Sequence, residues 1–131
     1  MRTLIAEDDS TNSFLLEAFL STYGQCLVVD NGKKAVEAFR VAAEVGQPYD
    51  LVCMDVVMPV MDGHHAVRLI RALERTLGVL PDTRVKIIMT TALSDRGNVI
   101  LSAREECDAF VLKPINTVRL MDHLKLFGLV K

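Results

Sequence analysis

The sequence predicts an α/β fold in which a doubly wound, parallel sheet of five strands is covered by five helices. Two observations support this prediction. Short apolar runs typical of strands alternate strictly with longer stretches in which apolar residues recur at helical spacing. The strand-like runs are apolar almost throughout, as expected for strands buried on both faces. Right-handed crossovers between parallel strands then place the helices on both faces of the sheet.

The predicted strands are runs of four or five residues. They are 3–6 (TLIA), 26–29 (CLVV), 51–54 (LVCM), 85–89 (VKIIM) and 109–112 (AFVL). A chain of 131 residues is long enough to bury one core and no longer than a typical single domain. We therefore expect residues 1–131 to form one domain.

The first predicted helix follows the first strand and begins at Ser10 or Thr11, either of which can cap a helix. Later helices are expected to begin at Gly32 and after Gly63, and to lie around 98–105. Asn116 or Thr117 can cap the last helix. The apolar positions expected to face the sheet are, in chain order, Phe14, Leu15, Ala18 and Phe19; Ala35, Val36, Phe39, Ala42 and Ala43; Ala66, Val67, Ile70 and Leu73; and Leu120, Met121, Leu124 and Phe127.

The composition excludes several classes of function. Lys and Arg number 15 against 17 Asp and Glu, so the chain has no basic excess for nucleic acid. No apolar run approaches the about 18 residues that span a membrane, and the start does not resemble a signal peptide. The three cysteines are odd in number and lie in or beside apolar runs, which favours free thiols in a reducing compartment. We therefore expect a cytoplasmic protein.

Polar residues stand at the carboxyl ends of four predicted strands. They are Glu7, Asp8 and Asp9; Asp55; Thr90 and Thr91; and Lys113. Ligands of such sheets bind at this edge, where the strand order reverses. Carboxylates that meet there repel one another, and Mg²⁺ resolves this because it prefers one or two carboxylates together with water and phosphate oxygens. The pattern therefore predicts a Mg²⁺ site centred on Asp55, with phosphate as its guest. Taken alone, the acidic run 7–9 is more typical of a helix N-terminus, and only the polar residues at the other strand ends favour a metal site.

Several short motifs together resemble the receiver domain of two-component response regulators. They are Glu7-Asp8, 54–59 (MDVVMP), 61–63 (MDG), Thr91-Ala92 and Lys113-Pro114. The match extends from about residue 2 to residue 127 and so covers nearly the whole chain. The resemblance implies a flavodoxin-like sheet with strand order 2-1-3-4-5. It also implies a stand-alone, chemotaxis-regulator-like receiver that takes a phosphoryl group from a histidine kinase.

The resemblance also assigns roles to residues of the site. Asp55 corresponds to the phosphoacceptor, the carboxylate that attacks phosphorus. Asp8 and Asp55 are expected to bind Mg²⁺ directly, together with the backbone carbonyl of Val57. Glu7 is expected to act on the metal through a water molecule.

Further roles concern the phosphoryl group and the response to it. Thr91 and Lys113 are expected to bind phosphoryl oxygens, and the Lys113-Pro114 bond is expected to be cis. Movement of Thr91 towards Asp55 is expected to open space for the aromatic switch residue Phe110. Val57 and Leu93 flank the approach of the hydrolytic water and have no polar atom to orient it. We therefore expect a long-lived phosphoprotein.

The expected partners are a sensor histidine kinase or a phosphotransfer protein, and a downstream target protein. A second copy of the chain could bind through the fifth strand and its two flanking helices. Neither nucleic acid nor membrane is expected as a partner, nor is catalysis on an external substrate. Because the chain ends soon after the last helix, output is expected by protein contact or by passing the phosphoryl group on, as a relay intermediate.

Two alternatives remain open at this stage. One is an inactive receiver-like adaptor, against which the full set of acidic, Thr and Lys residues argues. The other is a flavodoxin-like electron carrier. That function needs a Ser/Thr/Gly-rich phosphate loop after the first strand, where this chain has acidic residues that would repel a flavin phosphate.

Overall fold

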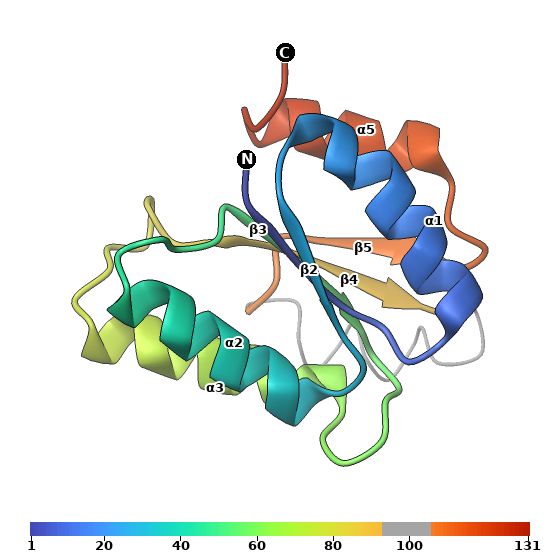
Figure 1. Ribbon diagram of the computed structural model, residues 1–131. Helices are drawn as coiled ribbons and strands as arrows, with labels where there is room; N and C mark the ends of the chain where they lie inside the picture. The colour runs from blue at the N-terminus through green and yellow to red at the C-terminus, as the bar shows by residue number, and fades with distance from the viewer. Residues whose placement is uncertain (93–105) are drawn as a thin grey trace.

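The computed structural model describes residues 1–92 and 106–131. A five-stranded sheet lies between two layers of helices (Figure 1). Helices α1 (Ser10–Leu20) and α5 (Thr117–Leu126) cover one face, and α2 (Gly32–Glu44) and α3 (Gly63–Thr76) cover the other. A short 3-10 helix, η1 (Ser21–Tyr23), follows α1. The predicted helix at 98–105 lies outside the described residues.

All strands of the sheet run parallel, in the order β2-β1-β3-β4-β5. Their bounds are β1 (Thr3–Ala6), β2 (Cys26–Val29), β3 (Leu51–Asp55), β4 (Lys86–Thr91) and β5 (Ala109–Leu112). The predicted fold class and strand order are thereby confirmed. β2 is added on one side of β1, whereas β3, β4 and β5 are added in turn on the other side. The strand order therefore reverses between β1 and β3. This reversal places a ligand crevice at the carboxyl ends of those two strands.

Two strands extend further than the sequence predicts. β3 includes Asp55, which lies opposite Thr90 of β4, and β4 continues to Thr91, which lies opposite Leu112 of β5. The added residues are polar, so apolar runs alone end the strands too early. They remain in the sheet because each has a backbone partner on the neighbouring strand. The Asp55 carboxylate and the Thr91 side chain are therefore held by sheet backbone rather than by a loop.

In α1, α2, α3 and α5, the side chain of the preceding residue caps the first turn. Asp9 Oδ1 accepts hydrogen bonds from the N–H groups of Thr11 (2.8 Å) and Asn12 (3.3 Å), so Asp9 is the cap of α1. The prediction of Ser10 or Thr11 is therefore wrong, because Ser10 is already the first helical residue. Asn116 caps α5, as predicted.

The predicted inner face of α1 is wrong in part, because only Phe19 of its four residues packs against the core. Phe14 is 73% exposed and Leu15 is also exposed, whereas Leu16 and Leu20 are buried against the sheet and α5. Apolar residues lie almost all the way round this helix, so spacing alone cannot select the buried side. The contacts with distant elements decide it. The consequence is an exposed aromatic side chain one turn from the acidic residues.

The core consists of two apolar layers, one on each face of the sheet. Leu4, Val52 and Ile87 face α2 and α3, whereas Ile5, Cys53 and Ile88 face α1 and α5. This alternation follows from the two-residue period of a strand. All three cysteines are free thiols, as predicted. Within the described ranges, no helix combines the length and the apolar character needed to cross a membrane.

Candidate functional site

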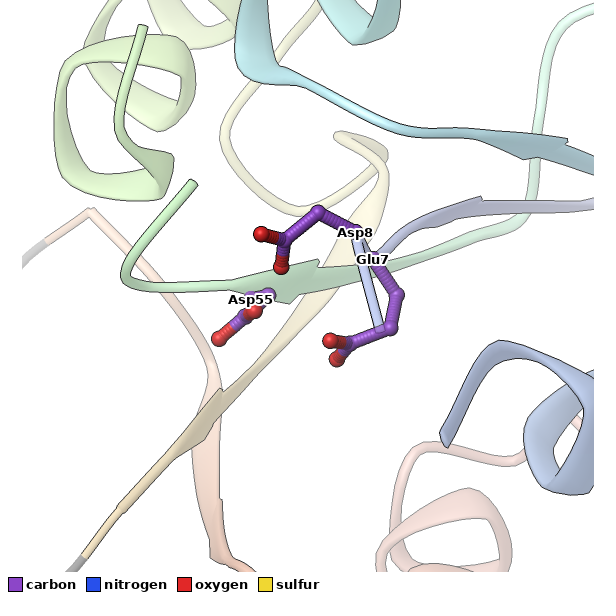
Figure 2. A group of neighbouring side chains, drawn as sticks. All are labelled: Glu7, Asp8 and Asp55. Atoms are coloured by element: carbon purple, nitrogen blue, oxygen red, sulfur yellow. The ribbon is translucent and has the colours of Figure 1, made fainter. Parts of the chain in front are cut away.

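Three carboxylates converge at the carboxyl ends of β1 and β3 (Figure 2). Glu7 and Asp8 directly follow β1, and Asp55 is the last residue of β3. One oxygen of each carboxylate lies within 4.8 Å of those of the other two. Glu7 and Asp55 are buried, and Asp8 is exposed. The predicted grouping of these residues is thus what the structure shows.

Lys113 approaches the carboxylates from the end of β5. Its Nζ lies 3.0 Å from Asp55 Oδ1 and donates a hydrogen bond of 3.2 Å to Glu7 Oε1. Burial acts to lower the pKa of Lys113, but the hydrogen bond and charge of Asp55 and the charge of Glu7 outweigh it. The net pKa is raised, so the ammonium remains charged at neutral pH.

The single positive charge of Lys113 does not neutralise the carboxylates of the site. Burial, followed by the neighbouring Glu7 carboxylate, raises the pKa of Asp55 to about 7, even though Lys113 acts in the opposite direction. Asp55, buried beside a second carboxyl group, therefore resists ionisation even with the ammonium at 3.0 Å. An additional cation at this position would favour the ionised form of Asp55.

The donor set fits a magnesium ion. The three side chains offer only oxygen atoms, which hard divalent cations prefer, and the exposed Asp8 leaves one side open to water or phosphate. Glu7 Oε2 is buried and makes no hydrogen bond within the described part of the chain, although Lys113 Nζ lies 3.2 Å away. A buried oxygen with spare acceptor capacity is consistent with a further positive partner, bound directly or through water.

The loop from β3 to α3 closes tightly over the end of β3. Val56 N–H donates to Thr90 O (3.0 Å), and Gly63 N–H donates to Val56 O (2.8 Å). A Cβ atom at Gly63 would lie 2.0 Å from the Asp55 carbonyl oxygen, so only glycine allows this approach. Asp62 Oδ1 accepts from His65 N–H (2.8 Å) and caps α3. The helix predicted to follow this position is confirmed, and Gly63 is its first residue.

The remaining predicted site residues lie around this group. Thr91 is buried at the end of β4, and its Oγ1 donates to Ala92 O (3.2 Å). Thr91 O also accepts from Lys113 N–H (2.8 Å), and the Lys113-Pro114 bond is cis, as predicted. Phe110 is partly buried and packs against the core layer on the α2–α3 face. Leu93 lies outside the described residues.

Gly32, which the sequence predicts only as the start of a helix, contacts the loop that borders the site. Its N–H donates to Met61 O (3.0 Å) in the loop between β3 and α3. The signal in the sequence is the glycine itself, just after the second predicted strand, because a residue without a Cβ atom allows a close backbone approach.

A family model described as "Response regulator receiver domain" matches residues 3–125. The chain belongs to this family. Among curated relatives, this receiver domain is 37% identical to the rice protein "Two-component response regulator ORR41" (Oryza sativa subsp. japonica), over 92% of this chain and 88% of that protein. It is 29% identical to "Histidine kinase 5" of Arabidopsis thaliana, over 96% of this chain but only 15% of the kinase.

Solved structures agree with this assignment. One is the receiver domain of a Pseudomonas aeruginosa sensor histidine kinase, described with a magnesium ion coordinated in its active site cleft. It is 29% identical to this chain with a TM-score of 0.76, and the match covers 96% of this chain and 95% of that chain. The Saccharomyces cerevisiae Ssk1 receiver domain, crystallised with the histidine phosphotransfer protein Ypd1, has a TM-score of 0.80 and 25% identity and covers 98% of this chain and 88% of that chain.

Proposed function

We propose that this receiver domain accepts a phosphoryl group from a phosphohistidine onto Asp55, with the help of Mg²⁺, and thereby switches a partner-binding surface. The observation that carries the proposal is the position of Asp55. Its carboxylate ends a central strand, within 4.8 Å of oxygens of Glu7 and Asp8 and 3.0 Å from Lys113 Nζ. The family and a neighbour with magnesium in its cleft support the same assignment.

The proposed reaction is a transfer from nitrogen to oxygen. A carboxylate oxygen of Asp55 forms a bond to phosphorus while the phosphorus–nitrogen bond of the donor breaks. The imidazole leaves with the electron pair and takes up a proton, and an acyl phosphate remains on Asp55. The domain modifies itself and does not turn over an external substrate.

Such a transfer has a loose transition state, so positioning and charge neutralisation supply most of the catalysis. When bound, Mg²⁺ would neutralise charge on the phosphoryl oxygens and would be held by Asp8, Asp55 and the Val57 carbonyl, with Glu7 acting through water. Lys113 offers a compact positive charge to one phosphoryl oxygen. Thr91 Oγ1 donates to the Ala92 carbonyl at 3.2 Å. It can give up this hydrogen bond and donate to a second phosphoryl oxygen instead.

The proposed switch links Thr91 to Phe110. Phe110 on β5 is now partly buried against the core layer on the α2–α3 face. If Thr91 moves towards the phosphoryl group, it leaves space into which the Phe110 ring can turn. Ligand binding would then shift an existing equilibrium rather than create a new fold. The output surface would comprise β5, α5 and the segment 98–105, which lies outside the described residues. A target protein or a second copy of the chain would bind there.

The proposed phosphodonor is a histidine kinase or a histidine phosphotransfer protein. Exposed apolar side chains support protein docking beside the acceptor: Phe14 and Leu15 on α1, and Val60, which is 77% exposed, in the loop after β3. The Ssk1 receiver domain was crystallised with a histidine phosphotransfer protein, and several relatives are histidine kinases. These relatives also favour a role as a relay intermediate that passes the phosphoryl group on.

The test is phosphoryl uptake from acetyl phosphate with Mg²⁺, followed by intact-mass spectrometry. The wild-type chain should gain one phosphoryl group, and Asp55→Asn should gain none, because an amide of the same shape cannot attack phosphorus. Asp82→Asn, which changes an exposed aspartate away from the site, is the matched control and should behave as wild type.

Each other outcome has a defined meaning. Undiminished uptake by Asp55→Asn would remove Asp55 from its proposed role. No uptake by the wild-type chain would contradict the proposed function and favour an inactive adaptor. Asp8→Ala should weaken Mg²⁺ binding and stop uptake, and a folded Asp8→Ala protein that binds Mg²⁺ like wild type would contradict the metal assignment.

A further inference from the structure

We infer that Gly32, on α2, is a positioning residue for the metal and phosphoryl site, an inference that rests on the proposed function. Gly32 is buried, and its N–H donates to the Met61 carbonyl at 3.0 Å. A Cβ atom at Gly32 would lie 2.4 Å from Met61 O and 3.0 Å from Asp62 O. The φ angle of Gly32 is not positive, so lack of space, and not conformational freedom, requires glycine here.

The loop that Gly32 contacts contains a residue with strained backbone geometry, Val60. Val60 has a φ of 69°, which a β-branched residue rarely adopts, and Met61 N–H donates to Pro59 O (2.7 Å) around it. Strain of this kind persists only where surrounding contacts determine the conformation. The hydrogen bond from Gly32 to Met61 O supplies such a contact directly beside the strained residue.

The loop also carries the backbone carbonyl of Val57. At one end Val56 is fixed to Thr90 O and to Gly63 N–H, and at the other end Met61 is fixed to Gly32. Val57 lies between these two anchors, so the direction of its carbonyl depends on both. Groups that orient a metal ligand typically change metal affinity about 10–100-fold when they are removed.

The start of α2 is itself held in place by its cap. Asn31 Oδ1 accepts from Lys34 N–H (2.9 Å), which orients the first turn from which Gly32 N–H projects. The free N–H of a first helical turn normally needs a partner outside the helix. Here the partner lies in the loop that ends at α3, so α2 connects the edge of the sheet to the acceptor site.

The test compares Gly32→Ala with Gly46→Ala. Gly46 has a φ of 76° and no atom within 4 Å of an added Cβ, so its substitution strains the chain without touching the site. For Gly32→Ala we expect Mg²⁺ affinity, measured by calorimetry, to fall about tenfold. Phosphoryl uptake should slow at low Mg²⁺ and recover at saturating Mg²⁺. In the metal-free protein, the Gly63 amide should exchange its hydrogen faster. Gly46→Ala should leave all three quantities unchanged.

Unchanged Mg²⁺ affinity and unchanged Gly63 exchange in folded Gly32→Ala would overturn the inference. If Gly32→Ala does not fold, Asn31→Ala decides, because it removes the cap and adds no atom beside Met61. Faster Gly63 exchange and weaker Mg²⁺ binding in Asn31→Ala would support the inference, and wild-type values would overturn it. A wild-type chain that takes up no phosphoryl group would contradict the proposed function alone, since the exchange measurement needs neither metal nor phosphate.

Discussion

Substitution of Arg71 by methionine should strongly destabilise the domain. Arg71 is 1% exposed and joins α3 to the starts of β4 and β5, at the end of the sheet opposite the candidate site. Its hydrogen bonds are Nε to Glu106 O (2.7 Å), Nη1 to Glu74 Oε1 (2.7 Å) and Val85 O (2.8 Å), and Nη2 to Asp108 Oδ2 (3.0 Å). Methionine fills similar space but leaves two carboxylates without a counter-charge.

The expected magnitude follows from the burial of these partners. Removal of one member of a buried ion pair typically costs about 3–5 kcal/mol, because the remaining charge stays buried. A chain of 131 residues has an unfolding entropy of about 0.28 kcal/mol/K. The melting temperature should therefore fall by roughly 11–18 °C.

Urea denaturation and thermal unfolding, followed by circular dichroism, measure this loss. Arg40→Met is the matched control, because Arg40 also pairs with acidic residues on its own helix (Glu37 and Glu44), but its side chain is 40% exposed to water. Its substitution should change stability far less, since exposed ion pairs contribute little.

A triple variant separates charge from packing. Arg71→Met combined with Glu74→Gln and Asp108→Asn removes all three charges of this cluster. The new amide oxygens can still accept from Val85 N–H and Ile87 N–H, which now bond to the carboxylates at 2.7 and 2.8 Å. The triple variant should recover much of the lost stability. If Arg71→Met alone lies within about 1 kcal/mol of wild type, the typical effect of any substitution, the cluster does not stabilise the fold as argued.

Three further predictions concern the strained loop, phosphoryl lifetime and the thiols. Val60→Gly should raise the free energy of unfolding in urea by about 1 kcal/mol, because glycine relieves the left-handed strain; a loss of stability would contradict this. Val57→Asn should speed loss of the phosphoryl group about tenfold, since an amide can orient the water, and equal decay by mass spectrometry would exclude that role. Burial raises the pKa of Cys53 to about 12 and of Cys107 to about 11, and it also raises that of Cys26. With iodoacetamide at pH 8, half-buried Cys26 should therefore react first and slowly, and modification of Cys53 at the same rate would be inconsistent with its burial.

The sequence by itself determined the fold class and the grouping of the site. Strands that are apolar throughout, in strict alternation with helical stretches, leave few arrangements other than a parallel sheet with helices on both faces. In such a sheet all carboxyl ends lie at one edge. Residues that follow different strands, such as Glu7, Asp55 and Lys113, can therefore be placed together before any contact is known.

Only the tertiary structure decided which face of α1 is buried and which charged residues lie inside. Phe14 and Leu16 are both apolar, and the sequence around them has no polar side to distinguish them. Arg71 and Glu74 continue the buried stripe of α3, one turn after Val67 and Ile70 respectively. The sequence alone predicts that such charged residues are exposed, because their buried partners lie on distant segments.

The contact between Gly32 and Met61 likewise required the structure. It joins two backbones that belong to different helix–loop units, and glycine is needed there because an added Cβ would meet the Met61 oxygen at 2.4 Å. Local sequence patterns reflect the secondary-structure preferences of residues that are neighbours in the chain. The approach of distant segments depends on the packing of all layers together, and side-chain spacing carries no information about it.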